Sequence, residues 1–377
     1  MAKAADNISD ARSVFASIAD IIADARAGRI FVLVDDERRE NEGDLVIPAA
    51  TATAEAVNFM ARYGRGLICL ALSAERAAQL KLEPMQRRNA ARFDTAFTVS
   101  IEAKEGISTG ISAADRARTI ATAIDERAGP EDLATPGHVF PVVARDGGVL
   151  VRAGHTEAAV DIARLAGLPP AGVICEIMND DGTMARRNDL IGYCRRHGLR
   201  IGTISELIAY RRRHDRLVER RLERSFDSHY GGTFRMVVYA NTLDGTEHVA
   251  LVKGDVAGGG PVLVRVHKLD VVADLLGEAA DGRGRELHAA MELVGREGRG
   301  VIVLIGEDRP RALSDRLSST DTGAGSELRD VGLGSQILLD LGVRAMCVLS
   351  NSERTIVGLD GFGLEVAGWR PIPTGKG

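Results

Sequence analysis

An acidic stretch near the amino end, residues 35–48, places the strongest constraint on the fold. It reads DDERRENEGDLVIP and lies between two short apolar runs, 30–34 and 45–47, which are typical of buried strands. Carboxylates gathered between two strands repel one another unless a cation or hydrogen-bond donors compensate them. Oxygen ligands of this kind suit Mg²⁺ or Mn²⁺ rather than zinc. A solvated acidic turn is the alternative.

Strand-like and helix-like segments alternate along the whole chain. This alternation predicts an α/β (α+β) fold in which helices cover a sheet. The 377 residues are enough for two domains. We expect a first domain at 1–210, a basic linker at 211–231 and a second domain at 232–377. The expected strands of the first domain lie at 30–34, 45–47, 67–72, 138–143, 149–151 and 172–177, and its expected helices at 8–27, 54–63, 112–124, 157–165 and 187–197.

Composition excludes several classes of partner. The net charge of −5 gives no overall attraction to nucleic acid or anionic membranes. The linker sequence RRRHDRLVERRLER is basic, but its Asp and Glu residues favour a solvated connecting helix over a nucleic-acid patch. The amino end has neither a signal-peptide core nor a membrane span. The cysteines have no CxxC spacing and are expected to be reduced buried thiols, which indicates the cytoplasm; they are Cys69, Cys175, Cys194 and Cys347.

A second polar cluster, VRAGHTE at 151–157, joins an expected strand to an expected helix. Thr156 can cap the helix, whose free N–H groups can bind an anion. Arg152 adds a forked cationic donor, and Gly154 allows close approach of the backbone. These features predict a phosphate site. His155 lies in the same turn, where it could be a metal ligand, a base or a structural residue.

Two more polar residues stand in apolar surroundings. His138 lies in TPGHVFP, and Glu176 lies in the run GVICEIM. A core histidine and a carboxylate at a strand end would explain both. The alternative is a pair of acid–base groups with pKa values tuned by their environment.

The motifs of residues 8–210 resemble the 3,4-dihydroxy-2-butanone 4-phosphate synthase family of riboflavin biosynthesis. The similar strings are DDERRENEGDLVIPA, FTVSIEA, STGISAADRARTI, PGHVFP, RAGHTEAAVDIARLAG and CEIMNDDGTMAR. One departure is Thr135, where the family often has a basic residue. The resemblance implies a homodimeric enzyme that converts D-ribulose 5-phosphate to L-3,4-dihydroxy-2-butanone 4-phosphate and formate with a divalent metal.

The resemblance also implies roles for individual residues. Glu40 and His155 match the positions that hold the metal, normally Mg²⁺. His138, Glu176 and Asp44 are the expected catalytic groups. The positions that match substrate contacts are Arg39, Glu40, Asp44, Arg152, Ala153, Gly154, His155, Thr156 and Glu176.

Residues 232–377 resemble GTP cyclohydrolase II in the strings HVALVKGD, PVLVRVH, EGRGVIVL and DVGLGSQILLDLGV. That family holds zinc with three cysteines, but here VRVH is followed by Lys268-Leu269-Asp270, and no cysteine lies between Cys194 and Cys347. We therefore expect no zinc and no opening of the GTP ring. The region could stabilise a dimer, bind a regulatory nucleotide or metabolite, or carry a changed activity. For the whole chain, the alternatives are a bifunctional enzyme and a non-catalytic sensor of sugar phosphates or nucleotides.

Overall fold

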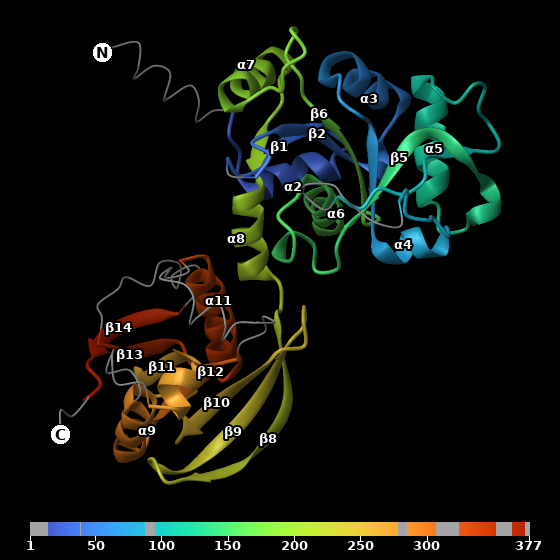
Figure 1. Cartoon of the computed structure of the whole chain (residues 1–377). Helices are drawn as coiled ribbons and strands as arrows, with labels where there is room; N and C mark the ends of the chain where they lie inside the picture. The colour runs from blue at the N-terminus through green and yellow to red at the C-terminus, as the bar shows by residue number, and fades with distance from the viewer. Residues whose placement is uncertain are drawn as a thin grey trace, which may run out of the picture. The chain divides into compact units, whose positions relative to one another are not determined.

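The computed structural model describes residues 14–37, 39–86, 95–277, 285–306, 324–351 and 364–373. The chain divides into two compact units, Met1–Arg211 and Arg212–Gly377, which Figure 1 colours from blue to green and from yellow to red. None of the helices in the described ranges is both long and apolar enough to cross a membrane.

The first unit is built on a mixed seven-stranded sheet with the order β4-β5-β3-β6-β2-β1-β7. β2 is central to the site because it pairs antiparallel with both β1 and β6. The strands are β1 (Phe31–Val34), β2 (Gly43–Pro48), β3 (Cys69–Leu72), β4 (Ile101–Ala103), β5 (Leu133–Val143), β6 (Ala171–Glu176) and β7 (Ile201–Thr203).

Helices cover both faces of this sheet. Successive strand residues point to opposite faces, so Leu45 and Ile47 enter one apolar core while Val46 enters the other. Figure 1 shows α2 and α6 on one face and α3 and α7 on the other. The helices are α2 (Ile18–Arg26), α3 (Ala54–Phe59), the π-helical turn η2 (Met60–Gly64), α4 (Ala74–Gln79), α5 (Ala113–Ile124), α6 (His155–Leu165), α7 (Arg187–His197) and α8 (Ile204–His214). The resulting three layers agree with the predicted α/β class.

The start of α5 follows the rule for helix capping. Ser112 is the N-cap residue, and its hydroxyl accepts a hydrogen bond of 3.1 Å from the Asp115 N–H. The helix ends at Ile124, so the predicted bounds of this element are confirmed.

The second unit has its own seven-stranded sheet, with the order β14-β13-β11-β12-β10-β9-β8. Strands β11 to β14 run parallel, and β8 to β10 add an antiparallel half. Its elements are β8 (Val218–Ser228), β9 (Gly232–Asn241), β10 (Glu247–Lys253), β11 (Val262–Lys268), the π-helical turn η5 (Val271–Leu275), α9 (Glu286–Glu297), β12 (Gly300–Ile305), α11 (Ala324–Asp340), β13 (Ala345–Leu349) and β14 (Glu365–Arg370).

Three predicted segments differ from the structure. The expected helix 8–27 begins only at Ile18, because the Ser17 hydroxyl caps it by accepting a hydrogen bond from the Asp20 N–H, and the expected residues 8–13 lie outside the described residues. Most of the expected basic linker, 211–231, is the strand β8, which pairs with β9 at the edge of the second sheet. Its alternating charges suit an edge strand that has one side open to water. The expected strand at 149–151 is instead a 3₁₀ turn, Gly148–Leu150, because the Val149 N–H donates to the carboxylate of Asp161 rather than to a neighbouring strand.

Candidate active site

The acidic loop between β1 and β2 is organised by the carboxylate of Asp35. Its Oδ1 accepts a hydrogen bond from the Glu42 N–H at 2.8 Å, and its Oδ2 accepts one from the Glu40 N–H at 3.0 Å. Arg39 Nη1 donates to the same Oδ2 at 3.0 Å. The side chain of Asp35 is fully buried by these donors. Backbone and side-chain donors therefore compensate one of the clustered carboxylates and fix the loop.

Glu40 is held at the end of this loop by two arginines. Arg39 Nη1 lies 2.5 Å from Glu40 Oε2, and Arg186 donates to the Glu40 carbonyl at 2.8 Å. Burial opposes ionisation of Glu40, but His155 and Arg39 outweigh burial and lower its pKa. Glu40 therefore presents a charged carboxylate.

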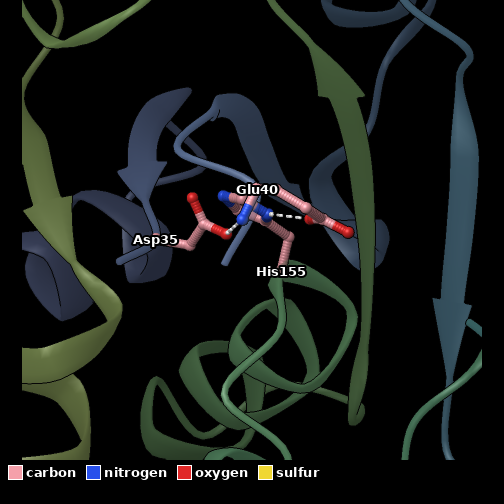
Figure 2. A group of neighbouring side chains, drawn as sticks. All are labelled: Asp35, Glu40 and His155. Carbon is pink, nitrogen blue, oxygen red and sulfur yellow. Dashed lines mark hydrogen bonds and ion pairs between the residues drawn. The ribbon is translucent and has the colours of Figure 1, made fainter. Parts of the chain in front are cut away.

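His155 is the first residue of α6, and its side chain points toward Asp35 and Glu40 (Figure 2). Its Nε2 lies 3.2 Å from the carbonyl oxygen of Leu33. A carbonyl can only accept, so Nε2 carries the proton. The other ring nitrogen, Nδ1, lies 3.8 Å from Glu40 Oε2 and 3.8 Å from Asp44 Oδ1. The Leu33 carbonyl thus fixes the tautomer that turns Nδ1 toward two carboxylates.

Two further carboxylates, Asp44 and Glu176, lie beside Glu40 and His155 or on the adjoining strand. Leu33 on β1 is in register with Asp44 on β2, and Asp44 is in register with Glu176 on β6, so the two carboxylates share one face. Burial raises the pKa of Asp44 to about 7, against the opposing charge of His155. Glu176 Oε2 accepts a hydrogen bond of 2.8 Å from the Leu67 N–H.

The cluster has the donors that a hard divalent cation requires. Ligand atoms of Asp35, Glu40 and His155 all lie within 4.8 Å of one another. Asp35 already accepts three hydrogen bonds, whereas Asp44 Oδ1 is buried and accepts none from the described residues. Carboxylate oxygens and an imidazole nitrogen that are fixed before binding fit Mg²⁺ or Mn²⁺.

The segment 152–156 spans the start of α6. Gly154 is the N-cap residue and forms no side-chain cap, so the predicted capping role of Thr156 is wrong. Thr156 lies inside the first turn, where it is buried. Arg152 Nη1 instead donates to Glu157 at 2.6 Å, and its Nη2 donates to Thr95 Oγ1 at 3.0 Å. Glu157 belongs to the string VRAGHTE, but nothing in the sequence indicated that its carboxylate accepts from Arg152.

His138 lies apart from this cluster, on β5. Its Nδ1 is 2.9 Å from Glu102 Oε2 on the neighbouring strand β4, and 43% of its side chain is exposed. No hydrogen bond or ion pair joins His138 to Glu40, Asp44, His155 or Glu176 within the described ranges. Glu102 was not identified from the sequence, although it lies in the string FTVSIEA.

In the second unit, a buried pair stands at the end of β11. His267 Nε2 lies 2.9 Å from Asp274 Oδ2, and the side chains are 8% and 5% exposed. Asp270, in the segment where the resemblance implies a cysteine, accepts hydrogen bonds from the first N–H groups of η5. Residues 278–284 and 307–323 of this unit lie outside the described residues.

Comparison with known proteins assigns both units. Residues 19–210 match the family 3,4-dihydroxy-2-butanone 4-phosphate synthase, and residues 219–371 match GTP cyclohydrolase II. A Salinispora arenicola protein named riboflavin biosynthesis protein RibBA is 48% identical, with 96% of this chain and 90% of that protein covered. A Pseudomonas aeruginosa protein named 3,4-dihydroxy-2-butanone 4-phosphate synthase is 47% identical over 94% of this chain and 98% of its own length.

Solved structures lead to the same family. RibBX of A. baumannii, described as a two-domain 3,4-dihydroxy-2-butanone 4-phosphate synthase, is similar with a TM-score of 0.74 and 43% identity, covering 94% of this chain and 99% of that one. A synthase in complex with two magnesium ions has a TM-score of 0.51 and 40% identity, covering 53% and 99%. The chain belongs to the 3,4-dihydroxy-2-butanone 4-phosphate synthase family, with a GTP cyclohydrolase II domain fused behind the synthase domain.

Proposed function

We propose that the first unit converts D-ribulose 5-phosphate to L-3,4-dihydroxy-2-butanone 4-phosphate and formate in riboflavin biosynthesis. The observation that supports this most directly is the meeting of Glu40, Asp44 and His155 Nδ1 beside the loop that carries Arg152. The relatives named for this activity cover nearly the whole chain.

Glu40 and His155 are the proposed ligands of Mg²⁺ or Mn²⁺. A bound divalent cation supplies Lewis-acid polarisation of the substrate's oxygens. Arg152 and the backbone N–H groups of His155 and Thr156 bind the phosphate at the start of α6. Ala153 and Gly154, whose own N–H donates to the Arg152 carbonyl at 2.8 Å, let the chain pass close to it. Arg39 fixes Glu40 and contacts the substrate.

Proton transfer is assigned to Asp44, Glu176 and His138. Asp44 and Glu176 are neighbours on one face of β2 and β6, so one carboxyl can take a proton while the other returns it. His138 stands apart in the same chain and is exposed. We therefore propose a homodimer in which His138 serves the partner's site. The cytoplasm is its proposed compartment, supported by cysteines without CxxC spacing.

The test of this function is formate release from ribulose 5-phosphate with Mg²⁺, with and without EDTA. Because Glu40 and His155 hold the cation, Glu40→Gln and His155→Ala are each expected to lower turnover about a thousandfold without unfolding the protein. Glu37→Gln is the matched control, since Glu37 is an exposed carboxylate of the same loop. Near-native turnover of either ligand variant, or no formate from the unaltered protein, would contradict the assignment.

For the second unit we propose that GTP cyclohydrolase II activity has been lost and that no zinc is bound. The support is the absence of cysteine between Cys194 and Cys347. At the end of β11, His267 is buried and faces Asp274. A tetrahedral thiolate site cannot be formed from Lys268-Leu269-Asp270. A bifunctional enzyme and a non-catalytic sensor are the competing hypotheses.

A further inference from the structure

Glu157 is a buried carboxylate in the first turn of α6 to which the proposed reaction assigns no role. It is fully buried, and both of its oxygens are used. Oε1 accepts a hydrogen bond from the Arg145 N–H at 3.0 Å, and Oε2 accepts one from Arg152 Nη1 at 2.6 Å. Both partners are donors, so only a carboxylate, which accepts at both oxygens, satisfies them together.

The contact with Glu157 sets the direction of the Arg152 guanidinium. A second contact, from Nη2 to Thr95 Oγ1 at 3.0 Å, fixes the plane of the group. The guanidinium lies directly against Gly154, because a Cβ there would come within 2.3 Å of Arg152 Nη1 and 2.7 Å of Glu157 Oε2. Arg152 is therefore held over the N-cap of α6, where the first N–H groups have no acceptor within the helix.

A carboxylate in the first turn of a helix also interacts favourably with the helix dipole and so stabilises the helix. A test of Glu157 must therefore distinguish this effect on stability from an effect on phosphate binding. The same helix offers a matched comparison one turn later. Asp161 is also buried, accepts a backbone hydrogen bond of 2.9 Å from Val149, and pairs with Arg211 Nη1 at 2.7 Å. In both pairs a buried carboxylate of α6 accepts from one backbone N–H and from one arginine. Arg211, however, lies at the end of the first unit and has no role in the proposed phosphate site.

We propose that Glu157 is a positioning residue for phosphate recognition: it fixes the Arg152 guanidinium over the start of α6, so that the guanidinium and the helix N–H groups bind one phosphate monoester together. The proposal rests on the proposed function, which assigns Arg152 to the phosphate. Glu157 touches neither substrate nor cation, and acts only through Arg152.

The first experiment is Glu157→Gln, with Asp161→Asn as the control. A glutamine can accept from only one of the two donors, so Arg152 loses its fixed direction. We expect the KM for ribulose 5-phosphate to rise about tenfold while kcat changes by less than about twofold, since a binding contact is lost rather than a reacting group. Inhibition by inorganic phosphate should weaken by the same factor. Asp161→Asn should lower the Tm to a similar extent and leave KM and phosphate inhibition unchanged.

The second experiment separates positioning from general damage. In an Arg152→Gln background, Glu157→Gln should have no further effect on phosphate affinity, because the residue through which it acts is gone. The phosphate-dependent rise in Tm measures this affinity without any turnover, so the inference is tested even if ribulose 5-phosphate is not the substrate. Equal phosphate affinities in Glu157→Gln and the unaltered protein, or additive losses in the double variant, would overturn it.

Discussion

At the scale of single residues, the site places His155 among carboxylates that change its protonation. Burial by itself would lower the pKa of His155, but the charges of Asp44, Glu40 and Asp35 together raise it to about 9. Near neutral pH, Nδ1 is therefore protonated as well as Nε2 in the cation-free protein, and the imidazole is positively charged. A metal ligand must offer a lone pair, so cation and proton compete for Nδ1.

This competition predicts that Mg²⁺ binding releases a proton. Near pH 7.5 we expect about one proton to leave per bound ion, so affinity should rise with pH until His155 is neutral. The folded-state pKa lies above neutrality, and the release should therefore fade as the pH passes through about 9. Calorimetric titration in two buffers with different ionisation enthalpies measures the number. His155→Asn is the control that should release none, and zero release by the unaltered protein would show that His155 is not a ligand.

Site residues could be predicted from the sequence where they lie in a motif that resembles a known family. The structure brings Glu40 and His155 to 3.8 Å, as the resemblance led us to expect. Glu157 and Glu102 were missed for a physical reason. A carboxylate in a first helical turn is ordinary, and only the folded loop shows that Glu157 receives Arg152. Glu102 meets His138 through the pairing of β4 with β5, which no local pattern encodes.

At the scale of elements, periodicity predicted the buried strands and the capped helices well. It failed where a backbone group is satisfied by a distant side chain or by a long-range partner. The turn Gly148–Leu150 depends on Asp161, and β8 depends on β9. The sequence of β8 is as rich in charge as a linker because an edge strand exposes many of its side chains to solvent.

At the end of β11, we predict that the second unit binds no zinc and does not act on GTP. His267 Nε2 lies 2.9 Å from Asp274 Oδ2, so the two side chains are paired. The residues directly after His267 are Lys268-Leu269-Asp270, which provide no thiolate. The purified protein is therefore expected to contain no zinc by elemental analysis and to release no formate from GTP, even with added Zn²⁺. The same preparation given ribulose 5-phosphate and Mg²⁺ provides the positive control. Zinc-dependent formate from GTP would establish the bifunctional enzyme instead.

At the scale of the whole molecule, the role proposed for His138 concerns how two copies of the chain are arranged. His138 is exposed on β5. Among the described residues, Glu102 is its one partner in a hydrogen bond or ion pair. In the described part of the chain, His155 is the one histidine in the group of possible cation ligands around Glu40. A homodimer in which each site takes His138 from the partner chain satisfies both observations, since a two-fold interface brings the same pair of surfaces together twice.

Co-expression of two inactive chains tests this arrangement. His138→Ala and Glu40→Gln should each lower turnover severely when expressed alone, the latter by about a thousandfold. In a mixed dimer, one site combines the intact Glu40 of the first chain with the intact His138 of the second, while the other site has lost both. Random pairing makes half of the dimers mixed, so about one quarter of the unaltered activity should return. Sedimentation equilibrium would confirm the dimer. A dimer without any recovery would place His138 in the site of its own chain, and a monomer with full activity would rule out the shared site altogether.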